Sequence, residues 1–338
     1  MSENALADAA SAQRPAPPEL RGAAVLSVGA SLPAGVVTNA TIAERIGKTD
    51  EWIYTRTGIR ERRHAAPDEL LVDHAVAAAV GALERAGVTA AALDLIVVGT
   101  LTPDLPMPNT AAMVAHALGA DRAGAVDLNA ACNGFLSALA LAAGSIEAGR
   151  AEHALVVGAD FISRIIDHES KQTAMLFADG AGAVVLAATP AGAGRVGPIL
   201  LRADASEPSA LMLARASGST IEMDGHATFK HAVARMAEIT REAVAEAGLT
   251  LEEIDLFVYH QANGRILKAV GERLALDEAR VVDCIELTGN MSAATLPYAL
   301  DVARADGRLR DGARVLLSAF GGGFTWGGGV IEWGRGDG

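Results

Sequence analysis

An internal duplication constrains the fold of this 338-residue chain more than any other feature of its sequence. The segments Ala86–Thr89 and Leu93–Val97 match Ala247–Thr250 and Ile254–Val258 at one offset of 161 residues, the separation of Ala86 from Ala247. Segments that repeat in one register fold into similar units. We therefore predict two similar halves, residues 22–190 and 191–338, packed as pseudo-symmetric partners.

The same offset relates two further pairs of segments. Asn129–Cys132 falls on Asn290–Ala293, and Leu155-Val156 falls on Leu316-Leu317. Functional residues should therefore lie where corresponding loops of the two halves meet. The segment Arg202–Gly225 breaks the register and is predicted to be an insertion near that place.

Short apolar runs alternate with helical periodicity, which predicts an α/β fold with parallel strands between helical layers. Hydrophobic residues make up 51% of the chain, so most of it is expected to be ordered. The predicted strands of the first half lie around Val25–Gly29, Leu95–Gly99, Ala125–Leu128, Leu155–Gly158 and Ala183–Leu186, and predicted helices cover Asp73–Ala86 and Thr110–Leu118.

Charge and cysteine content exclude several functional classes. The net charge of −13 argues against a general binder of nucleic acid or of anionic membranes. No apolar run reaches the ~18 residues of a membrane-spanning helix. Residues 1–21 lack the pattern of a signal peptide and are predicted to be a disordered leader. The two cysteines form neither a disulfide framework nor a metal site, which favours a reduced cytoplasmic enzyme.

Cys132 is a candidate nucleophile. A predicted strand leads through small residues to Cys132 and then into a helix containing Phe135 and Leu139. At a helix N-terminus, the dipole and the free N–H groups favour a thiolate. Most free cysteines are instead small buried hydrophobes, which is the expectation for Cys284 in the strand-like run Val281–Ile285.

His260 and Asn290 are the candidate partners of this cysteine. His260 follows the strand Leu256–Tyr259, and Asn290 is the duplicate of Asn129, which precedes Cys132. Open α/β sheets place their sites at the carboxyl ends of strands, where all three residues are predicted. A lone histidine at a strand end is otherwise more often structural.

The C-terminal segment Phe320–Gly327 is rich in glycine but lacks the Lys-Ser/Thr pair of a phosphate-binding loop. Its functional interpretation is a tight turn that offers a backbone N–H to an oxyanion, with Gly322 as the candidate. The alternative is glycine that allows close strand packing, which we expect for Gly327, Gly328 and Gly329.

Taken together, these segments resemble the β-ketoacyl-[acyl-carrier-protein] synthase III family from about residue 22 to the end of the chain. The resemblance implies the thiolase fold, with duplicated halves in five αβαβα layers, and a homodimer. It also implies a Cys132, His260 and Asn290 triad. The segments that carry it are Glu51–Arg62, Ala125–Phe135, Asp179–Ala183, His260–Asn263, Gly289–Ala294 and Gly321–Trp326.

The activity implied by the resemblance is condensation of an acyl-CoA primer with malonyl-[acyl-carrier protein]. A thiolate is a good nucleophile toward a thioester, the N–H groups of Cys132 and Gly322 suit an oxyanion, and His260 and Asn290 suit an enolate. No metal or redox cofactor is implied.

Further residues are assigned by the resemblance alone. Substrate and CoA contacts would come from Trp52, Arg56, Arg164, Asn263 and Phe324, and carrier-protein docking from Lys230, Arg265 and Lys268. Met107 stands where relatives commonly have a phenylalanine that closes the acyl pocket of the partner subunit. Because methionine is more flexible, a larger or branched acyl group could fit.

Two other functions compete with condensation. One is an acyltransferase, or a chain-joining ketosynthase of secondary metabolism, with a larger acyl substrate. The other is a non-catalytic partner that resembles a chain-length factor. Asn290 argues against transfer without decarboxylation, because an enolate is what needs this donor, and Cys132 argues against a non-catalytic role.

Overall fold

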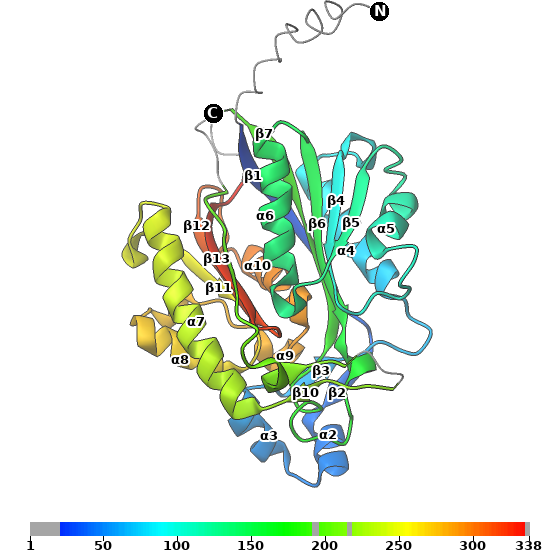
Figure 1. The fold of residues 1–338 in the computed structure, drawn as a ribbon, viewed down its shortest axis with the longest axis vertical. Coiled ribbons are helices and arrows are strands. Elements are labelled where there is room, and N and C mark those ends of the chain that lie inside the picture. Colours follow the sequence, from blue (N-terminus) through cyan, green and yellow to red (C-terminus); the bar gives the residue numbers. More distant parts are fainter. Residues whose placement is uncertain (1–20, 191–195, 215–217, 335–338) are drawn as a thin grey trace, which may run out of the picture.

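The computed structural model describes residues 21–190, 196–214 and 218–334 (Figure 1). The predicted leader therefore lies outside the described residues except for Arg21. This residue donates its backbone N–H to the carbonyl of Glu147, and its guanidinium pairs with Glu152. No helix among the described residues is long and apolar enough to cross a membrane.

The first half is built on a five-stranded sheet with the order β1-β7-β6-β4-β5. Strands β1, β4, β5 and β6 run in one direction, and β7 runs antiparallel to its neighbours β1 and β6, so the prediction of parallel strands is wrong for β7. The strands are β1 (Gly22–Ser31), β4 (Leu95–Gly99), β5 (Gly124–Leu128), β6 (His153–Phe161) and β7 (Asp179–Thr189), and the helices are α4 (Leu71–Ala86), α5 (Thr110–Leu118) and α6 (Gly134–Glu147).

The second half repeats this plan with a four-stranded sheet of order β11-β12-β13-β8. The counterpart of β5 is reduced to a single bridge between Phe257 and Val281. The predicted strand-like run Val281–Ile285 is therefore wrong, since a helix follows the bridge. The strands are β8 (Leu200–Ala203), β11 (Leu256–Tyr259), β12 (Arg314–Gly321) and β13 (Thr325–Glu332), and the helices are α7 (Gly225–Glu246), α8 (Gly264–Leu274), α9 (Ile285–Thr288) and α10 (Thr295–Ala305).

Elements of the two halves begin at the offset found in the sequence. Leu95 opens β4 and Leu256 opens β11, while Gly134 opens α6 and Thr295 opens α10. Polar anchors repeat as well. Asp94 accepts the N–H of His153 at the start of β6, as Asp255 accepts the N–H of Arg314 at the start of β12.

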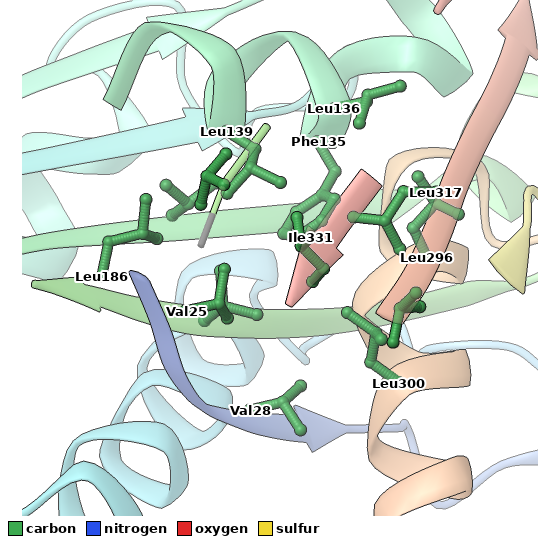
Figure 2. Packing of buried hydrophobic residues seen from close by; sticks show 14 of the residues in the cluster. Val25, Val28, Phe135, Leu136, Leu139, Leu186, Leu296, Leu300, Leu317 and Ile331 are labelled. Carbon is green, nitrogen blue, oxygen red and sulfur yellow. The ribbon is translucent and has the colours of Figure 1, made fainter. Parts of the chain in front are cut away.

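The two sheets pack on opposite sides of α6 and α10, which gives five αβαβα layers (Figure 1). Helices α4 and α5 cover the outer face of the first sheet, and α7 and α8 cover that of the second. Figure 2 shows residues of the central core, which come from both sheets and both central helices: Val25, Val28, Phe135, Leu136, Leu139, Leu186, Leu296, Leu300, Leu317 and Ile331. Each half therefore lacks a complete core without the other.

Additional segments surround the carboxyl ends of the central strands. Between β1 and α4 lie β2 (Val36–Thr38), α2 (Asn39–Ile46), α3 (Asp50–Thr57) and β3 (Glu61–Arg63). The predicted insertion Arg202–Gly225 starts later than expected, because Arg202 pairs with Trp326 within the second sheet. After β8 it contributes the short strands β9 (Leu211–Met212) and β10 (Glu222–Met223), which pair with each other.

Candidate active site

Cys132 lies in a 3-10 turn, Ala131–Asn133, that leads directly into α6. The turn is prepared by Asn129, whose Oδ1 accepts the N–H of Ala131 at 3.1 Å. Ala131 itself has a φ of 48°, a conformation that costs energy for a residue other than glycine. The predicted position at a helix N-terminus is therefore confirmed.

Burial determines the protonation of this thiol. Burial, with a smaller contribution from the negative charge of nearby Asp160, raises the pKa of Cys132 to about 11. The backbone N–H groups of Cys132 and Gly322 point at the thiol and lower its pKa, but they do not outweigh burial. The thiol is thus protonated at neutral pH, so the thiolate expected from the helix N-terminus alone is wrong.

His260 follows β11 and is buried. Burial lowers its pKa to about 3, so the ring is neutral at physiological pH. Its Nδ1 lies 2.6 Å from Oγ1 of Thr295, which also lies 2.9 Å from the carbonyl oxygen of Ser292. The carbonyl of Ser292 can only accept, so when both contacts are made the Thr295 hydroxyl donates to Ser292 and accepts the Nδ1 proton of His260. Nε2 of His260 becomes a donor when the hydroxyl turns from Ser292 and donates to Nδ1 instead.

Asn290 is held by the segment that follows β6. Its N–H donates to the carbonyl of Leu176, and its own carbonyl accepts the N–H of Ala178, both at 2.9 Å. Oδ1 of Asn290 accepts the N–H of Ser292, also at 2.9 Å. With Oδ1 engaged in this way, Nδ2 donates one hydrogen to the carbonyl of Ala262 at 3.4 Å and has a second hydrogen for the cavity that Asn290 lines.

Cys132, His260 and Asn290 line one cavity of about 410 Å³, as the sequence predicted. The outer end of this cavity is formed by Trp52 and Arg56. A second cavity of about 350 Å³, also mostly apolar, adjoins the first and shares Cys132, Phe177 and Leu211 with it. Its walls include Leu101, Ile162, Phe177, Leu211, Ile221 and Gly322. Leu211 and Ile221 belong to the predicted insertion, which therefore does lie at the site.

A glycine turn brings β12 against the cysteine turn. A Cβ at Gly321 would lie 2.7 Å from the backbone nitrogen of Cys132, so no side chain fits there. Gly322 follows and lines the apolar cavity. Phe324, a predicted substrate contact, lines neither cavity and is buried with its ring centroid 4.8 Å from that of Phe320. The prediction for Phe324 is therefore wrong, and Phe320 instead lines the larger cavity, which contains the triad.

The outer end of the larger cavity is cationic. Arg56 lies over the Trp52 ring at 4.1 Å, and Lys48 approaches the same ring at 5.4 Å. Lys171 and Gln172 complete this end and were missed by the sequence analysis, because nothing in the sequence marks a charged residue of an irregular segment as facing a cavity.

Arg164 is not part of this cavity. Its guanidinium donates to Oδ1 of Asp104 at 3.2 Å and to the carbonyl of Glu69, and it lies over the ring of Phe161. The predicted CoA contact of Arg164 is therefore wrong, and Lys171 occupies the wall where a cation was expected.

Asn263 and Arg265 extend the cavity wall on the side of α8. Asn263 Nδ2 donates to the carbonyl of Arg56, and its Oδ1 accepts the N–H of Arg265 as the N-cap of α8. Arg265 is exposed and lies over the ring of Phe229 at 5.6 Å. Lys230 and Lys268 are exposed nearby on α7 and α8, with Lys268 3.9 Å from Glu272.

The chain is similar to proteins of one family over almost its whole length. The family model described as 3-Oxoacyl-[acyl-carrier-protein (ACP)] synthase III matches residues 126–205, and the model of its C-terminal part matches residues 244–333. A β-ketoacyl-[acyl-carrier-protein] synthase III of Bradyrhizobium diazoefficiens is 44% identical over 319 residues, covering 91% of this chain and 98% of the relative. That of Rhodospirillum rubrum is 46% identical over 318 residues, with the same coverage.

Solved structures agree. The 3-oxoacyl-[acyl-carrier-protein] synthase III of Aquifex aeolicus superimposes with a TM-score of 0.88 and 39% identity, covering 92% of this chain and all of that one. The priming β-ketosynthase of the R1128 polyketide pathway superimposes with a TM-score of 0.90 and 39% identity, covering 94% of this chain and 98% of that one.

Proposed function

The chain belongs to the 3-oxoacyl-[acyl-carrier-protein] synthase III family, and we propose that it condenses an acyl-CoA primer with malonyl-[acyl-carrier protein] through an acyl-Cys132 intermediate. The observation that carries this proposal is the convergence of Cys132, His260 and Asn290 on one cavity, with an apolar cavity beyond the thiol. The enzyme is an acyltransferase, and its product starts a fatty-acid or polyketide chain.

The first half-reaction transfers the acyl group to Cys132. The sulfur attacks the thioester carbonyl, and the acyl chain enters the apolar cavity. The N–H groups of Cys132 and Gly322, which already point at the sulfur, donate to the oxyanion that forms beside it. A donor of this kind is typically worth roughly 3–4 kcal/mol of transition-state stabilisation.

The second half-reaction releases carbon dioxide from the malonyl thioester and builds negative charge on its carbonyl oxygen. Neutral donors suit this charge, because they stabilise it without first binding the malonyl carboxylate as a cation would. Asn290 supplies Nδ2, and His260 supplies Nε2 when Thr295 donates to Nδ1. The resulting carbanion attacks the acyl group on Cys132, and the thiol is released.

CoA binding is assigned to the cationic outer end of the cavity. The aromatic face of Trp52 suits the adenine, and Arg56 and Lys171 suit the phosphates. Asn263, which lines the wall between this end and the triad, suits the amides of the pantetheine arm. No metal or redox group is needed for this chemistry, since the thiol and the neutral donors supply each step.

The carrier protein is proposed to dock on Lys230, Arg265 and Lys268. Acidic carrier proteins are repelled at long range by a protein of net charge −13, so encounter depends on a local cationic patch. Arg265 lines the cavity itself, which places this patch beside the path of the pantetheine arm. Lys268 contributes least, because Glu272 lies close to it.

A homodimer is proposed from the free edge of the first sheet. Strand β5 pairs only with β4 among the described strands, and Val126 on this edge is 49% exposed. Met107, on the loop before α5, is 85% exposed, which is costly for a large apolar side chain unless a partner covers it. A second copy paired along β5 would allow Met107 to close the apolar cavity of its partner. Because both cysteines are unpaired, we place the enzyme in the cytoplasm.

One experiment separates condensation from acyl transfer without decarboxylation and from a non-catalytic role. The protein is incubated with acyl-CoA and malonyl-[acyl-carrier protein], and protein adducts and carrier-bound products are weighed by mass spectrometry. We expect the acyl adduct on the Cys132 peptide and none on the Cys284 peptide. The carrier-bound product should be a β-ketoacyl group that has gained the acyl group and lost carbon dioxide relative to the malonyl group. An adduct that persists in Cys132→Ala, or carbon dioxide release without a β-ketoacyl product, would refute the proposal.

A further inference from the structure

Arg62 is a buried charge that the proposed mechanism does not use. It lies in the middle of β3, and its side chain is fully buried. Nη1 donates to Oδ1 of Asn39 at 2.9 Å and to the carbonyl of Val37 at 3.3 Å, and Nη2 donates to the carbonyl of Met175 at 2.8 Å. All three acceptors are neutral, and the carboxylate of Asp50 is reached only through Nδ2 of Asn39. Because a charge buried without a counterion is destabilising, an apolar residue would serve better if packing were its only role.

The Met175–Ala178 segment, which leads into β7, is held on one side by β3 and by the residue that follows it. Arg62 donates to the carbonyl of Met175, and Nε2 of His64 lies 3.2 Å from the carbonyl of Phe177. A carbonyl can only accept, so Nε2 carries the proton of the neutral His64 ring. Two alternate carbonyls of this segment are thus fixed from the side of β3.

The other side of the same segment holds Asn290. The N–H of Asn290 donates to the carbonyl of Leu176, and the N–H of Ala178 donates to the carbonyl of Asn290, both at 2.9 Å, which makes a parallel β-bridge. Gly289 fits directly between Arg62 and the segment. A Cβ there would lie 2.9 Å from Cβ of Arg62 and 3.0 Å from the carbonyl oxygen of Leu176. The backbone of Asn290 is therefore placed by the segment that Arg62 holds.

The direction of the free donor hydrogen of Asn290 depends on this backbone placement. Oδ1 accepts the N–H of Ser292, but the contact of Nδ2 with the carbonyl of Ala262 is long, at 3.4 Å. A shift of the Asn290 backbone would therefore move the donor relative to the cavity. A misplacement of about 1 Å caused by a residue far from the chemistry can cost a hundredfold in rate. Whatever holds the Met175–Ala178 segment thus sets how well this donor is aimed.

We propose that Arg62 is a positioning residue for decarboxylation, because it holds the Met175–Ala178 segment and this segment holds Asn290 where Nδ2 can donate to the enolate oxygen. This inference rests on the proposed condensation and adds a residue that touches no substrate. Arg62 is not among the described residues that line the two cavities, so its effect reaches the enolate through Asn290. A lysine cannot replace it fully, since an ammonium lacks the planar fork that reaches Asn39 and Met175 together.

The test is a double-mutant cycle of Arg62→Met with Asn290→Ala, in which the two half-reactions are assayed separately. Arg62→Met keeps an unbranched side chain and removes the donors. Alone, it should slow decarboxylation of malonyl-[acyl-carrier protein] on the order of tenfold to a hundredfold, in kcat rather than in KM. Acylation of Cys132 should fall much less, because its oxyanion donors come from Cys132 and Gly322. In the Asn290→Ala background, Arg62→Met should slow decarboxylation no further, since substitutions that act through one group are not additive.

Arg63→Met is the matched control, because Arg63 is the next residue on β3 and its guanidinium donates to the carbonyl of Pro33 instead, at 3.4 Å. It should decarboxylate at the wild-type rate. Arg62→Lys should lie between the wild type and Arg62→Met, and it takes the place of Arg62→Met in the cycle if thermal unfolding shows that the latter does not fold. Additive losses in the double variant, equal losses of both half-reactions, or an unimpaired Arg62→Met overturn the positioning role. Failure of the wild type to decarboxylate the malonyl thioester overturns the proposed function itself.

Discussion

The turn before α6 and the turn before α10 are the same local structure with different contents. In each, an asparagine Oδ1 accepts the N–H two residues later, Asn129 to Ala131 and Asn290 to Ser292. Each turn is contacted by a strand from the other half: β12 contacts the turn before α6, and β6 contacts the turn before α10. The shared backbone is thus a property of the fold and precedes any catalytic use.

The two turns differ in the group that faces the backbone N–H of the following residue, which is Cys132 in the first turn and Ala293 in the second. The N–H of Ala293 is capped by Asp160, whereas the N–H of Cys132 faces Gly321, where a Cβ would lie 2.7 Å from the nitrogen. The N–H of Cys132 is therefore left available to the proposed oxyanion, whereas the N–H of Ala293 is satisfied by Asp160. Glycine at 321 is needed for an available donor rather than for backbone freedom, since Gly321 is not among the glycines with positive φ.

Closing the open N–H should have the largest effect. Gly321→Asp would crowd the first turn, because its Cβ would lie 2.7 Å from the nitrogen of Cys132, and would place a carboxylate beside that N–H. We expect acylation to fall on the order of a hundred- to a thousandfold, the usual loss for an oxyanion donor. The rate is measured by rapid quench, with Gly321→Ala as the milder variant and thermal unfolding as the check on folding. Unchanged acylation would mean that this N–H does not bind the oxyanion.

The asparagine of the second turn should be catalytic as well as structural. Asn290→Ala removes the Nδ2 donor together with the Oδ1 acceptor of the turn. We expect decarboxylation of the malonyl thioester to fall by about a hundredfold and acylation by much less, because only the enolate needs this donor. Separate assays of the two half-reactions measure the split. Equal losses in both would assign Asn290 a structural role only.

One histidine in each half, the half-buried His64 and the buried His260, should make the fold sensitive to acid. Burial lowers the pKa of His64 to about 4 and that of His260 to about 3, from 6.5. Between these values and 6.5 the unfolded chain binds more protons, so stability falls as pH falls through that window. At pH 5 the loss relative to pH 7.5 should be about 2 kcal/mol for each histidine.

Urea unfolding of wild type, His64→Gln and His260→Gln at several pH values measures this effect. Each substitution should flatten the decline of unfolding free energy between pH 7.5 and pH 5 by about half. If the decline is the same in all three proteins, the two histidines are not the groups that respond.

The smallest effect is expected at the surface of the second half. Arg265→Glu should raise the KM for malonyl-[acyl-carrier protein] several-fold, and more than it raises the KM for acyl-CoA. The wild-type rate with carrier protein should also fall with added salt, because exposed charges are screened over ~8–10 Å. Arg273→Glu, at the other end of the exposed face of α8, is the control. A larger effect on acyl-CoA than on carrier protein would assign Arg265 to the CoA phosphates.

Much of the architecture could be predicted because short segments of sequence indicate its strands and helices, and because these segments occur in both halves. The segment from Leu93 to Val97 repeats as Ile254 to Val258, and the strands β4 and β11 begin at the expected places. The cysteine turn was located by the small residues before Cys132 and by its duplicate at Asn290. Prediction was wrong where residues lack such a signal, as for Arg164, Phe324 and the direction of β7.

By itself, the sequence determined the duplication, the two α/β halves and the meeting of Cys132, His260 and Asn290, because periodicity and a common offset can be recognised from the order of residues along the chain. Tertiary structure alone decided that Lys171 rather than Arg164 faces the cavity, and that Cys132 is a protonated thiol rather than a thiolate. It also brought Asp160 to within 3.2 Å of a backbone nitrogen 133 residues away. The physical reason is that burial and charge proximity depend on which surfaces pack together, and each half of this protein completes its core and its active site only against the other.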